Sequence, residues 1–477
     1  MDLPVVFSII ILINIISGVT IVFFERRNPT ATAAWLMVLF FLPLAGFVLY
    51  LFFGQNYTRQ RMFVVKERAD RCYLEDLFEE QRRALAGRLH RFATPVAEEF
   101  RDTIFLLLQN NRAYLTEKNR VDIYTRGEEK FEALFDAIRG ARHHIHLEYF
   151  IVNNDDLGQA VVHALAEKAR EGVEVRFLFD AIGAMSGGGS RAAFSELEDA
   201  GGKIGVFFPS FYRVNYRNHR KIAVIDGVVG FIGGFNIGDS YLGDGPLGPW
   251  RDTAVRITGD AVKQLQFRFF LDWNYTTDEH LSLEAPYFPD GVGPGTTPVQ
   301  IVSGGPDTRW NPIKEGYIKL ITSARESVYI QTPYFIPDES VTDALRIAAL
   351  SGVDVRIMIP CKPDHPFVYW ATLSFIGDVL DAGVRAYTYD AGFLHAKTIV
   401  VDRKAGSVGS ANWDIRSFRL NFEANAFFYD ATVGAELART FEEDLTVSTE
   451  ITLAGYRARP LRIRVKESVS RLFSPLG

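Results

Sequence analysis

Two stretches of this sequence carry one pattern, H-x-K-x-x-x-x-D: His219-Arg220-Lys221-Ile222-Ala223-Val224-Ile225-Asp226 and His395-Ala396-Lys397-Thr398-Ile399-Val400-Val401-Asp402. A small-residue turn ending in asparagine follows each of them: Gly233-Gly234-Phe235-Asn236 and Gly409-Ser410-Ala411-Asn412. Farther along, each copy has an acid, Asp252 in the first and Glu423 in the second. One such motif alone would be weak evidence of a functional site. A second copy with the same turn and asparagine makes a chance match a poor explanation.

The repetition extends well beyond the motifs. Apolar periodicity predicts alternating helices and strands in the same order in both copies: 129–142, 144–150, 157–171 and 173–179, and then 317–327, 328–335, 340–350 and 353–359. Short sequence segments also recur, such as Gly172-Val173-Glu174-Val175-Arg176 and Gly352-Val353-Asp354-Val355-Arg356. This alternation predicts an α/β fold of two tandem lobes. A duplication of this size suggests a pseudo-twofold arrangement with the functional site at the seam.

The composition sets broad limits. The chain has 477 residues, of which 48% are apolar and 23% charged, so it can bury large cores and is not a disordered protein. Its two cysteines, Cys72 and Cys361, lie too far apart in sequence to suggest a disulfide framework or a cysteine-rich metal site. A net charge of -6 argues against a surface devoted to nucleic acid.

The first residues differ from the rest. Residues 3–24 and 34–53 are two uncharged stretches, each long enough to cross a ~30 Å hydrocarbon core as a helix. We expect a transmembrane hairpin rather than a cleaved signal peptide, because a basic leader is missing and a second apolar stretch follows. Basic residues after the second stretch then place the lobes in the cytoplasm by the positive-inside rule: Arg59, Arg61, Lys66, Arg68 and Arg71.

These observations divide the chain into an anchor and a duplicated remainder. We predict two transmembrane helices in 1–58, a juxtamembrane helical connector in 59–122, a first lobe in 123–275, a linker in 276–298 and a second lobe in 299–477. Proline and glycine crowd the linker, as is typical of a surface loop.

The doubled motif is suited to phosphodiester chemistry. If the motif lies on a strand, His219 and Lys221 share one face, and His395 and Lys397 repeat the arrangement. The lysines would neutralise phosphoryl oxygens, and Asn236, Asn412 and Ser410 would add hydrogen-bond donors. One histidine would attack phosphorus while the other protonates the leaving alkoxide.

Three histidines on one predicted strand, His143, His144 and His146, lack acids at ligand spacing, so we expect no metal there.

Carboxylates accompany both histidines. Asp252 and Glu423 are candidates for orienting the histidine rings, as the acid of a triad does. Asp226 and Asp402 close the catalytic motifs, but their opposite parity and position at the strand end predict a structural role, bonding turn backbone or a neighbouring cation. The residues leave open which histidine is the nucleophile.

The doubled H-x-K-x-x-x-x-D with its G-[GS]-x-N turn resembles the phospholipase D superfamily. Other segments look like the bacterial cardiolipin synthases within it: Ala31-Thr32-Ala33-Ala34-Trp35, Leu49-Tyr50-Leu51-Phe52-Phe53-Gly54 and Arg471-Leu472-Phe473-Ser474-Pro475-Leu476. The resemblance implies two phospholipase D-like lobes in a bacterial inner-membrane protein. It implies that two phosphatidylglycerol molecules are joined to give cardiolipin and glycerol, without a metal or nucleotide. It also implies that His219 attacks and His395 protonates. One departure is Gly234, which stands where the second copy has Ser410.

Other functions use similar residues. A membrane-bound phospholipase D would hydrolyse phospholipids to phosphatidic acid with the same motifs. A nuclease is less well supported because no basic aromatic strip accompanies the site, so we expect phospholipid and membrane partners and no nucleic acid. A non-catalytic scaffold that binds anionic lipid is disfavoured by two intact motifs. The sequence gives no oligomeric state.

Overall fold

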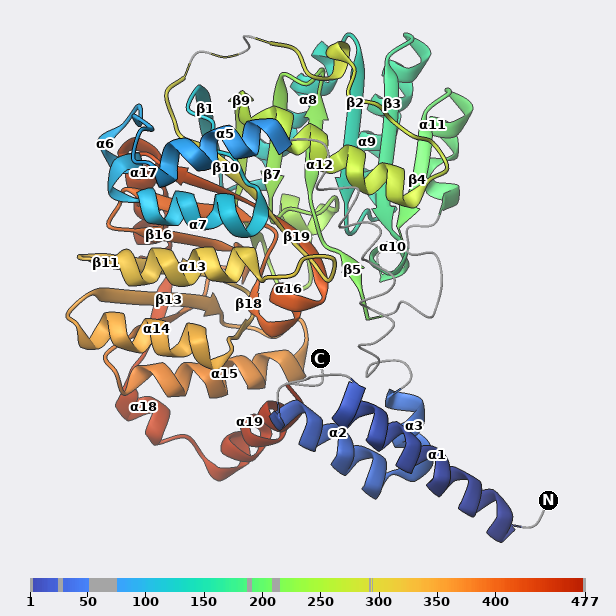
Figure 1. The fold of residues 1–477 in the computed structure, drawn as a ribbon, viewed down its shortest axis with the longest axis vertical. Helices are drawn as coiled ribbons and strands as arrows, with labels where there is room; N and C mark the ends of the chain where they lie inside the picture. Colours follow the sequence, from blue (N-terminus) through green and yellow to red (C-terminus); the bar gives the residue numbers. More distant parts are fainter. Residues whose placement is uncertain are drawn as a thin grey trace.

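The computed structural model describes residues 3–24, 29–50, 75–186, 191–207, 215–290, 293 and 295–474 of the chain. Two β-sheets with helices packed on them make up most of the molecule (Figure 1). The basic stretch Arg59–Arg71 and the turn at 25–28, on which the expected membrane orientation depends, lie outside the described residues.

The first sheet has seven strands from the first copy. Its spatial order is β1 (Asn119–Tyr124), β9 (Ala254–Gly259), β7 (Val229–Gly233), β6 (Ile222–Ile225), β2 (His144–Tyr149), β3 (Glu174–Asp180) and β4 (Lys203–Phe207). The strands β2, β3 and β4 run parallel, whereas β6, β7, β9 and β1 pair antiparallel. Parallel pairs require crossover helices, and α9 (Asp156–Arg170) connects β2 to β3.

The second sheet repeats this plan. Its order is β10 (Val299–Gly304), β19 (Asn421–Tyr429), β17 (Ala405–Gly409), β16 (Thr398–Val401), β11 (Ser327–Gln331), β13 (Asp354–Pro360) and β14 (Arg385–Tyr389), with β20 (Ser448–Ile451) added at the edge. Each strand of the first sheet therefore has a counterpart at the same place in the second. The predicted α/β fold with two similar lobes is confirmed.

Helices cover the sheets in each lobe. The first lobe has α8 (Gly127–Gly140), α9, α10 (Ala181–Ser186), α11 (Ser195–Asp199) and α12 (Ala261–Thr276); the second has α13 (Pro312–Ser323), α14 (Glu339–Leu350), α15 (Pro366–Leu380), α16 (Ile415–Arg419), α17 (Ala431–Leu445), α18 (Leu453–Arg457) and α19 (Leu461–Phe473). A preceding segment forms α5 (Glu75–Ala86), α6 (Pro95–Glu99) and α7 (Arg101–Asn111), and it packs against the second lobe through α13 and β10.

The two copies are joined by exchanged elements. Helix α12 of the first copy packs on β10 of the second, and α17 of the second packs on β1 of the first. Two short parallel pairs also cross the seam: β5 (Arg217–Asn218) with β19, and β8 (Trp250–Arg251) with β15 (Phe393–Leu394). One apolar core contains Ile222 and Val255 from the first copy together with Val400 and Val408 from the second. The seam is therefore a continuous hydrophobic interior, and it fixes the two motifs relative to each other.

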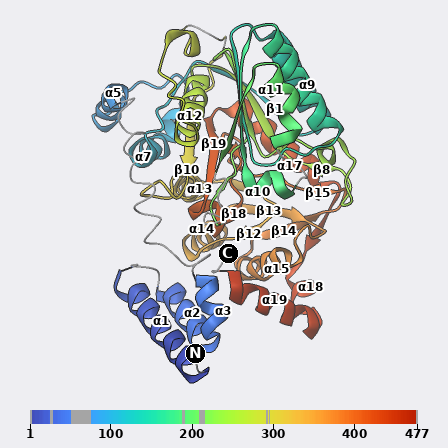
Figure 2. The same cartoon turned by 90° about the vertical axis from the view of Figure 1, so that its right-hand side faces the viewer.

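The N-terminal helices are α1 (Leu3–Phe24), α2 (Pro29–Phe41) and α3 (Pro43–Leu49), which pack around Ile21, Trp35, Leu39 and Tyr50. Both views place them beside α19, at the end of the molecule opposite the first sheet (Figures 1 and 2). Within the described part of the chain, no helix has both the length and the apolar character required to cross a bilayer.

The expected two-helix transmembrane hairpin of residues 3–24 and 34–53 is therefore not supported. The second stretch is not one helix, because it is broken before Pro43. Leu42 has the non-helical angles φ -125 and ψ 66, as the residue before a proline tends to. The 13-residue α2 that results is roughly 20 Å long, which is shorter than the ~30 Å hydrocarbon core.

Candidate active site

His219 lies at the seam, between β5 and β6. The parallel pairing of β5 with β19 holds its backbone, and the His219 amide donates to the carbonyl of Phe422 at 2.9 Å. Nδ1 of its ring lies 3.0 Å from Oε2 of Glu423 and 3.2 Å from the carbonyl oxygen of Ser410. Both of these neighbours are acceptors, so Nδ1 carries the proton and Nε2 keeps its lone pair.

His395 has the corresponding place in the second copy, between β15 and β16. The β8–β15 pair fixes its backbone, and the His395 amide donates to the carbonyl of Arg251 at 2.7 Å. Nδ1 of His395 lies 2.6 Å from Oδ2 of Asp252, 2.8 Å from Nζ of Lys397 and 3.2 Å from the hydroxyl of Tyr241. This nitrogen therefore faces an acceptor and a cationic donor, unlike Nδ1 of His219.

The carboxylates are exchanged between the copies. Glu423 of the second copy contacts His219 of the first, and Asp252 of the first contacts His395 of the second. Both acids are fully buried. Neither copy alone contains a histidine with its carboxylate, so the site exists only where the two lobes meet.

The two motif lysines supply buried positive charge. Lys221 Nζ donates to the carbonyl of its own motif histidine, His219, at 2.6 Å, and Lys397 bonds the carbonyl of His395 in the same way. Burial lowers the pKa of Lys221 well below its usual value, and burial lowers the pKa of Lys397 to about 8 although Asp252 opposes this. An anion bound between them would favour both ammonium forms, which is the electrostatic requirement of a phosphodiester site.

Both histidines are buried in the neutral form. Burial is the main reason that the pKa of His219 is lowered, and Glu423 only partly counters it. Burial and the neighbouring Lys397 lower the pKa of His395 to about 4. Burial by itself would raise the pKa of Asp252, but Lys397 and His395 outweigh it, so this carboxyl is ionised. A neutral imidazole has a free lone pair with which it can act as nucleophile or base.

The small-residue turns shape the two half-sites differently. A Cβ added at Gly234 would lie 2.0 Å from Oδ1 of Asp252, so only glycine leaves room for this acid. At the matching position, the Ser410 hydroxyl donates to Oε2 of Glu423 at 2.5 Å. The Ser410 hydroxyl, which we predict to contact substrate, thus also holds the Glu423 carboxylate.

The two asparagines also lie in the site region. Asn236 Nδ2 donates to the Tyr241 hydroxyl at 3.2 Å, and its Oδ1 accepts from the amide of Ile151 at 3.2 Å. Asn412 is buried, and its Oδ1 has no hydrogen-bond partner among the described residues. Of the three predicted substrate-binding residues, Asn412 is thus the one with an uncommitted side-chain atom.

Asp226 and Asp402 lie at the far ends of β6 and β16. Asp226 accepts from the backbone amides of Arg142, His143 and His144 at 2.8–2.9 Å. Asp402 accepts from three amides as well, those of Arg325, Glu326 and Ser327. Both aspartates tie the turn before β2 or β11 to the motif strand, and neither side chain contacts a histidine of the motif.

The strand prediction for the motif needs one correction. Strand β6 begins at Ile222 and β16 at Thr398, so the H-x-K residues immediately precede the strands. Pairing of β6 with β2 and β7 starts at Ile222, and the preceding residues are held by the crossing pairs of the seam instead.

Three aromatic residues near the histidines were not predicted. Tyr241, on the short 3₁₀ turn Asp239–Leu242, bonds Asn236 and contacts His395, while the ring centroid of Trp250 lies 5.1 Å from that of His395. The ring of Phe150 lies 4.8 Å from that of His219. Tyr241 lies five positions after Asn236 in the sequence. The residue five positions after Asn412 in the second copy is Ser417, so comparing the two copies does not point to Tyr241.

Among the described residues, no group of three or more His, Cys, Asp or Glu side chains is arranged to hold a metal.

Comparison with known proteins agrees with this geometry. A family model described as "Cardiolipin synthase, PLD-like domain" matches residues 134–269 and 317–445, which correspond to the two lobes. The major cardiolipin synthase of Bacillus subtilis (strain 168) is 50% identical over 479 residues, covering 99% of each chain. This chain belongs to the cardiolipin synthase family of phospholipase D-like enzymes. The resemblance seen in the two motifs is confirmed.

Further comparisons extend the family assignment to the remaining parts of the chain. The cardiolipin synthase of Staphylococcus aureus (strain N315) is 49% identical over 472 residues, covering 98% of this chain and 95% of the relative. A model described as "Phospholipase_D-nuclease N-terminal" matches residues 6–55. Among solved structures, the phosphatidylserine synthase of Haemophilus influenzae has the same fold, with a TM-score of 0.60 over 79% of this chain and 98% of that one, at 14% identity.

Proposed function

We propose that this member of the cardiolipin synthase family transfers a phosphatidyl group from one phosphatidylglycerol to another, giving cardiolipin and glycerol. The observation that carries the proposal is the pair of exchanged histidine–carboxylate contacts with a buried lysine beside each. Two histidines and two lysines at one seam suit a double displacement at phosphorus.

In the first step, Nε2 of His219 attacks the phosphorus of one phosphatidylglycerol. His395 takes up a proton when the anionic substrate binds; the bond from phosphorus to the glycerol head group then breaks, and this proton passes from His395 to the departing glycerol oxygen. The product is a phosphatidyl-histidine, and Glu423 stabilises the positive charge that develops on its ring. Lys221 and Lys397 neutralise the charge on the phosphoryl oxygens.

In the second step, the roles reverse. His395, now neutral, takes the proton from a head-group hydroxyl of a second phosphatidylglycerol as that oxygen attacks phosphorus. The bond between phosphorus and Nε2 of His219 breaks, which restores the free His219 ring. Asp252 orients the His395 ring through both steps.

The surroundings of the two Nδ1 atoms favour His219 as the nucleophile. Its Nδ1 has only acceptors nearby, which fixes the tautomer with a lone pair on Nε2. His395 lies against both Asp252 and the ammonium of Lys397. A ring with neighbours of both kinds is suited to gaining and losing a proton.

We also propose that the enzyme works at the bacterial inner-membrane surface. Exposed apolar side chains cover α1 and α2, including Ile15, Ile16, Phe23, Phe40 and Phe41. On the neighbouring α19, Leu461, Val465, Val469 and Leu472 are exposed along one face. Surfaces of this kind rarely face water alone, and a lipid interface would cover them where the substrates reside. The cytoplasmic side remains the expectation for the lobes.

Product analysis tests the proposed activity. Purified protein incubated with phosphatidylglycerol vesicles should release glycerol and cardiolipin in equal amounts. Phosphatidic acid accumulating without cardiolipin would instead identify a hydrolase. If both the His219→Ala and the His395→Ala variants, stably folded, still made cardiolipin at the parent rate, the proposed site would be wrong.

A further inference from the structure

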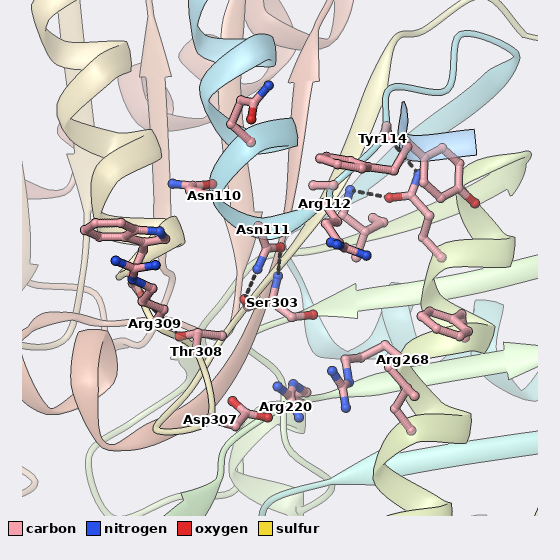
Figure 3. Close-up of a pocket in the computed structure, with 18 residues that line it drawn as sticks. Asn110, Asn111, Arg112, Tyr114, Arg220, Arg268, Ser303, Asp307, Thr308 and Arg309 are labelled. Carbon is pink, nitrogen blue, oxygen red and sulfur yellow. Dashed lines mark hydrogen bonds between the residues drawn. The ribbon is translucent and has the colours of Figure 1, made fainter. Parts of the chain in front are cut away.

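A cavity of about 310 Å³ lies between elements of the two lobes, and none of the motif histidines or lysines lines it. Its walls come from the end of α7, from α12, from β10 and from the loop after β10 (Figure 3). The first lobe contributes Arg220 to its floor, the residue between His219 and Lys221 in the first motif.

Four arginines lie around this space: Arg112, Arg220, Arg268 and Arg309 (Figure 3). Among the described residues that line the cavity, the only acid is Asp307. Two further carboxylates contact lining residues: Asp272 under the arginines of the floor, and Glu315, which accepts from Asn110 at 2.7 Å. Positive charge is in excess even when all three acids are counted.

The floor is rigid. Asp272 accepts from Arg220 Nη1 at 2.5 Å, and from Arg268 through Nε at 2.9 Å and Nη2 at 2.8 Å. One carboxylate thus serves two guanidinium groups. The two buried arginines are thus matched in number by two buried acids, Asp272 and Asp307, and the excess positive charge of the cavity lies at its rim.

The rim contributes two arginines that are more accessible. Arg309 is exposed and lies over the ring of Trp310 at 4.9 Å, and Arg112 is half-buried over the ring of Phe78 at 4.9 Å. Guanidinium groups bind phosphate oxygens in a bidentate manner, and several of them around a small cavity are typical of phosphate recognition. The volume of the cavity suits a head group rather than a whole lipid.

We propose that this cavity binds a phosphate-bearing anion, either free phosphate or the head group of an anionic lipid, at a site separate from the catalytic centre.

The floor connects the cavity to the reaction site. Arg220 Nε donates to the backbone carbonyl of Glu423 at 3.2 Å, and Glu423 holds His219 through its side chain. An anion that draws on the Arg220 guanidinium therefore acts on a residue bonded to both the motif and the acid. Occupancy should change the rate of cardiolipin formation without competing with phosphatidylglycerol at the histidines.

Trp310 provides the signal for a binding test. Sodium phosphate and, separately, dihexanoyl-phosphatidylglycerol below its micelle concentration are titrated into full-length protein while tryptophan fluorescence is followed. The lipid titration uses the His219→Ala background to prevent turnover. A Trp310→Phe variant identifies the part of the signal that comes from the cavity.

We expect a saturable change at Trp310 whose dissociation constant rises at least roughly tenfold in Arg112→Gln/Arg309→Gln, since two charged hydrogen bonds are lost. The matched control is Arg439→Gln, an exposed arginine on α17 outside the cavity, which should bind as the parent does. Arg309→Gln alone, at an exposed position, serves if the double variant does not fold. A response to phosphate alone identifies free phosphate as the ligand, and a response to the lipid identifies a head group.

The proposal is overturned if neither probe changes the Trp310 signal, or if the cavity variants and the control bind equally well. Loss of binding in these variants with unchanged cardiolipin synthesis would leave the binding site standing and remove its link to the rate. Because the test reads binding and not turnover, it also stands apart from the proposed transferase activity.

Discussion

Nδ1 of His219 lies 3.0 Å from Oε2 of Glu423, although the two residues are 204 positions apart in the sequence. The equivalent contact, between His395 and Asp252 at 2.6 Å, runs in the opposite direction across the seam. The duplicated fold thus produces one site with two complementary halves, and each half depends on the other copy for its acid.

Replacing either acid by its amide removes the negative charge beside the histidine and keeps a side chain of similar shape. In Glu423→Gln and Asp252→Asn the ring still has a hydrogen-bonding partner, but the imidazolium loses its counter-charge and the tautomer is no longer fixed. We expect kcat for cardiolipin formation to fall by roughly 10²–10⁴-fold, with a smaller change in KM. Glu450→Gln, at an exposed position on β20, is the control. Near-normal kcat in both amide variants would contradict the assigned role of the acids.

Anion binding should be linked to proton uptake at His395. In the free protein its pKa is about 4, lowered chiefly by burial and then by Lys397. A bound anion favours the imidazolium and raises this pKa toward its ordinary value of ~6.5. At pH between these values His395 is neutral before binding and gains a proton on binding. Calorimetry with a non-hydrolysable phosphonate lipid, repeated in buffers of different ionisation enthalpy, should therefore report proton uptake that is smaller in His395→Gln than in the parent protein. Equal uptake in that variant would exclude His395 as the proton acceptor.

The two turn residues should respond unequally to the same new side chain. Gly234→Ala places a Cβ against the Asp252 carboxylate and must displace it, whereas Ser410→Ala adds no atom and removes the hydrogen bonds of the hydroxyl with Glu423 and the Ala424 backbone. We expect a loss of at least roughly a hundredfold in kcat for the glycine variant, as expected when a catalytic group is misplaced. The serine variant should lose about tenfold or less. Steady-state rates on phosphatidylglycerol vesicles compare them; a reversed order would contradict the packing at Gly234.

The Asp226→Asn variant tests whether Asp226 has a structural or a catalytic role. In Asp226→Asn one side-chain oxygen that accepts a backbone amide becomes an NH₂ group, which faces another donor. The free energy of unfolding should fall by about 1–3 kcal/mol, while kcat of the folded fraction stays near that of the parent. Asparagine also tolerates the positive φ of 53° at this position, so backbone strain does not confound the result. A loss of kcat with unchanged thermal stability would make Asp226 catalytic.

Much of the fold follows from sequence periodicity. The predicted strand 144–150 is β2, His144–Tyr149, and the predicted helix 157–171 is α9, Asp156–Arg170. These elements are long, and their apolar patterns match one period. The helix predicted at 317–327 is α13, Pro312–Ser323, which begins earlier because Pro312 starts its first turn.

The site was only partly predictable for a different reason. The motifs identify the histidines, lysines and acids. The spacing of residues within one copy does not show which acid contacts which histidine across the seam. Tyr241 has no counterpart in the second copy, and the Ser410 hydroxyl is taken by Glu423, which only packing reveals. The second apolar stretch, 34–53, was wrongly predicted to be one membrane-spanning helix, because a count of apolar residues does not register the break before Pro43.

The division of labour between the two histidines is tested most directly by a substrate that needs no acid. A phosphatidyl ester of p-nitrophenol has a good leaving group, so attack on it does not depend on a proton from His395. His395→Ala should then release a rapid burst of about one nitrophenolate per protein molecule and stop at the phosphatidyl-histidine. His219→Ala should show no burst. A burst from His219→Ala with none from His395→Ala would reverse the assigned roles, and no burst from either variant would contradict a covalent histidine intermediate.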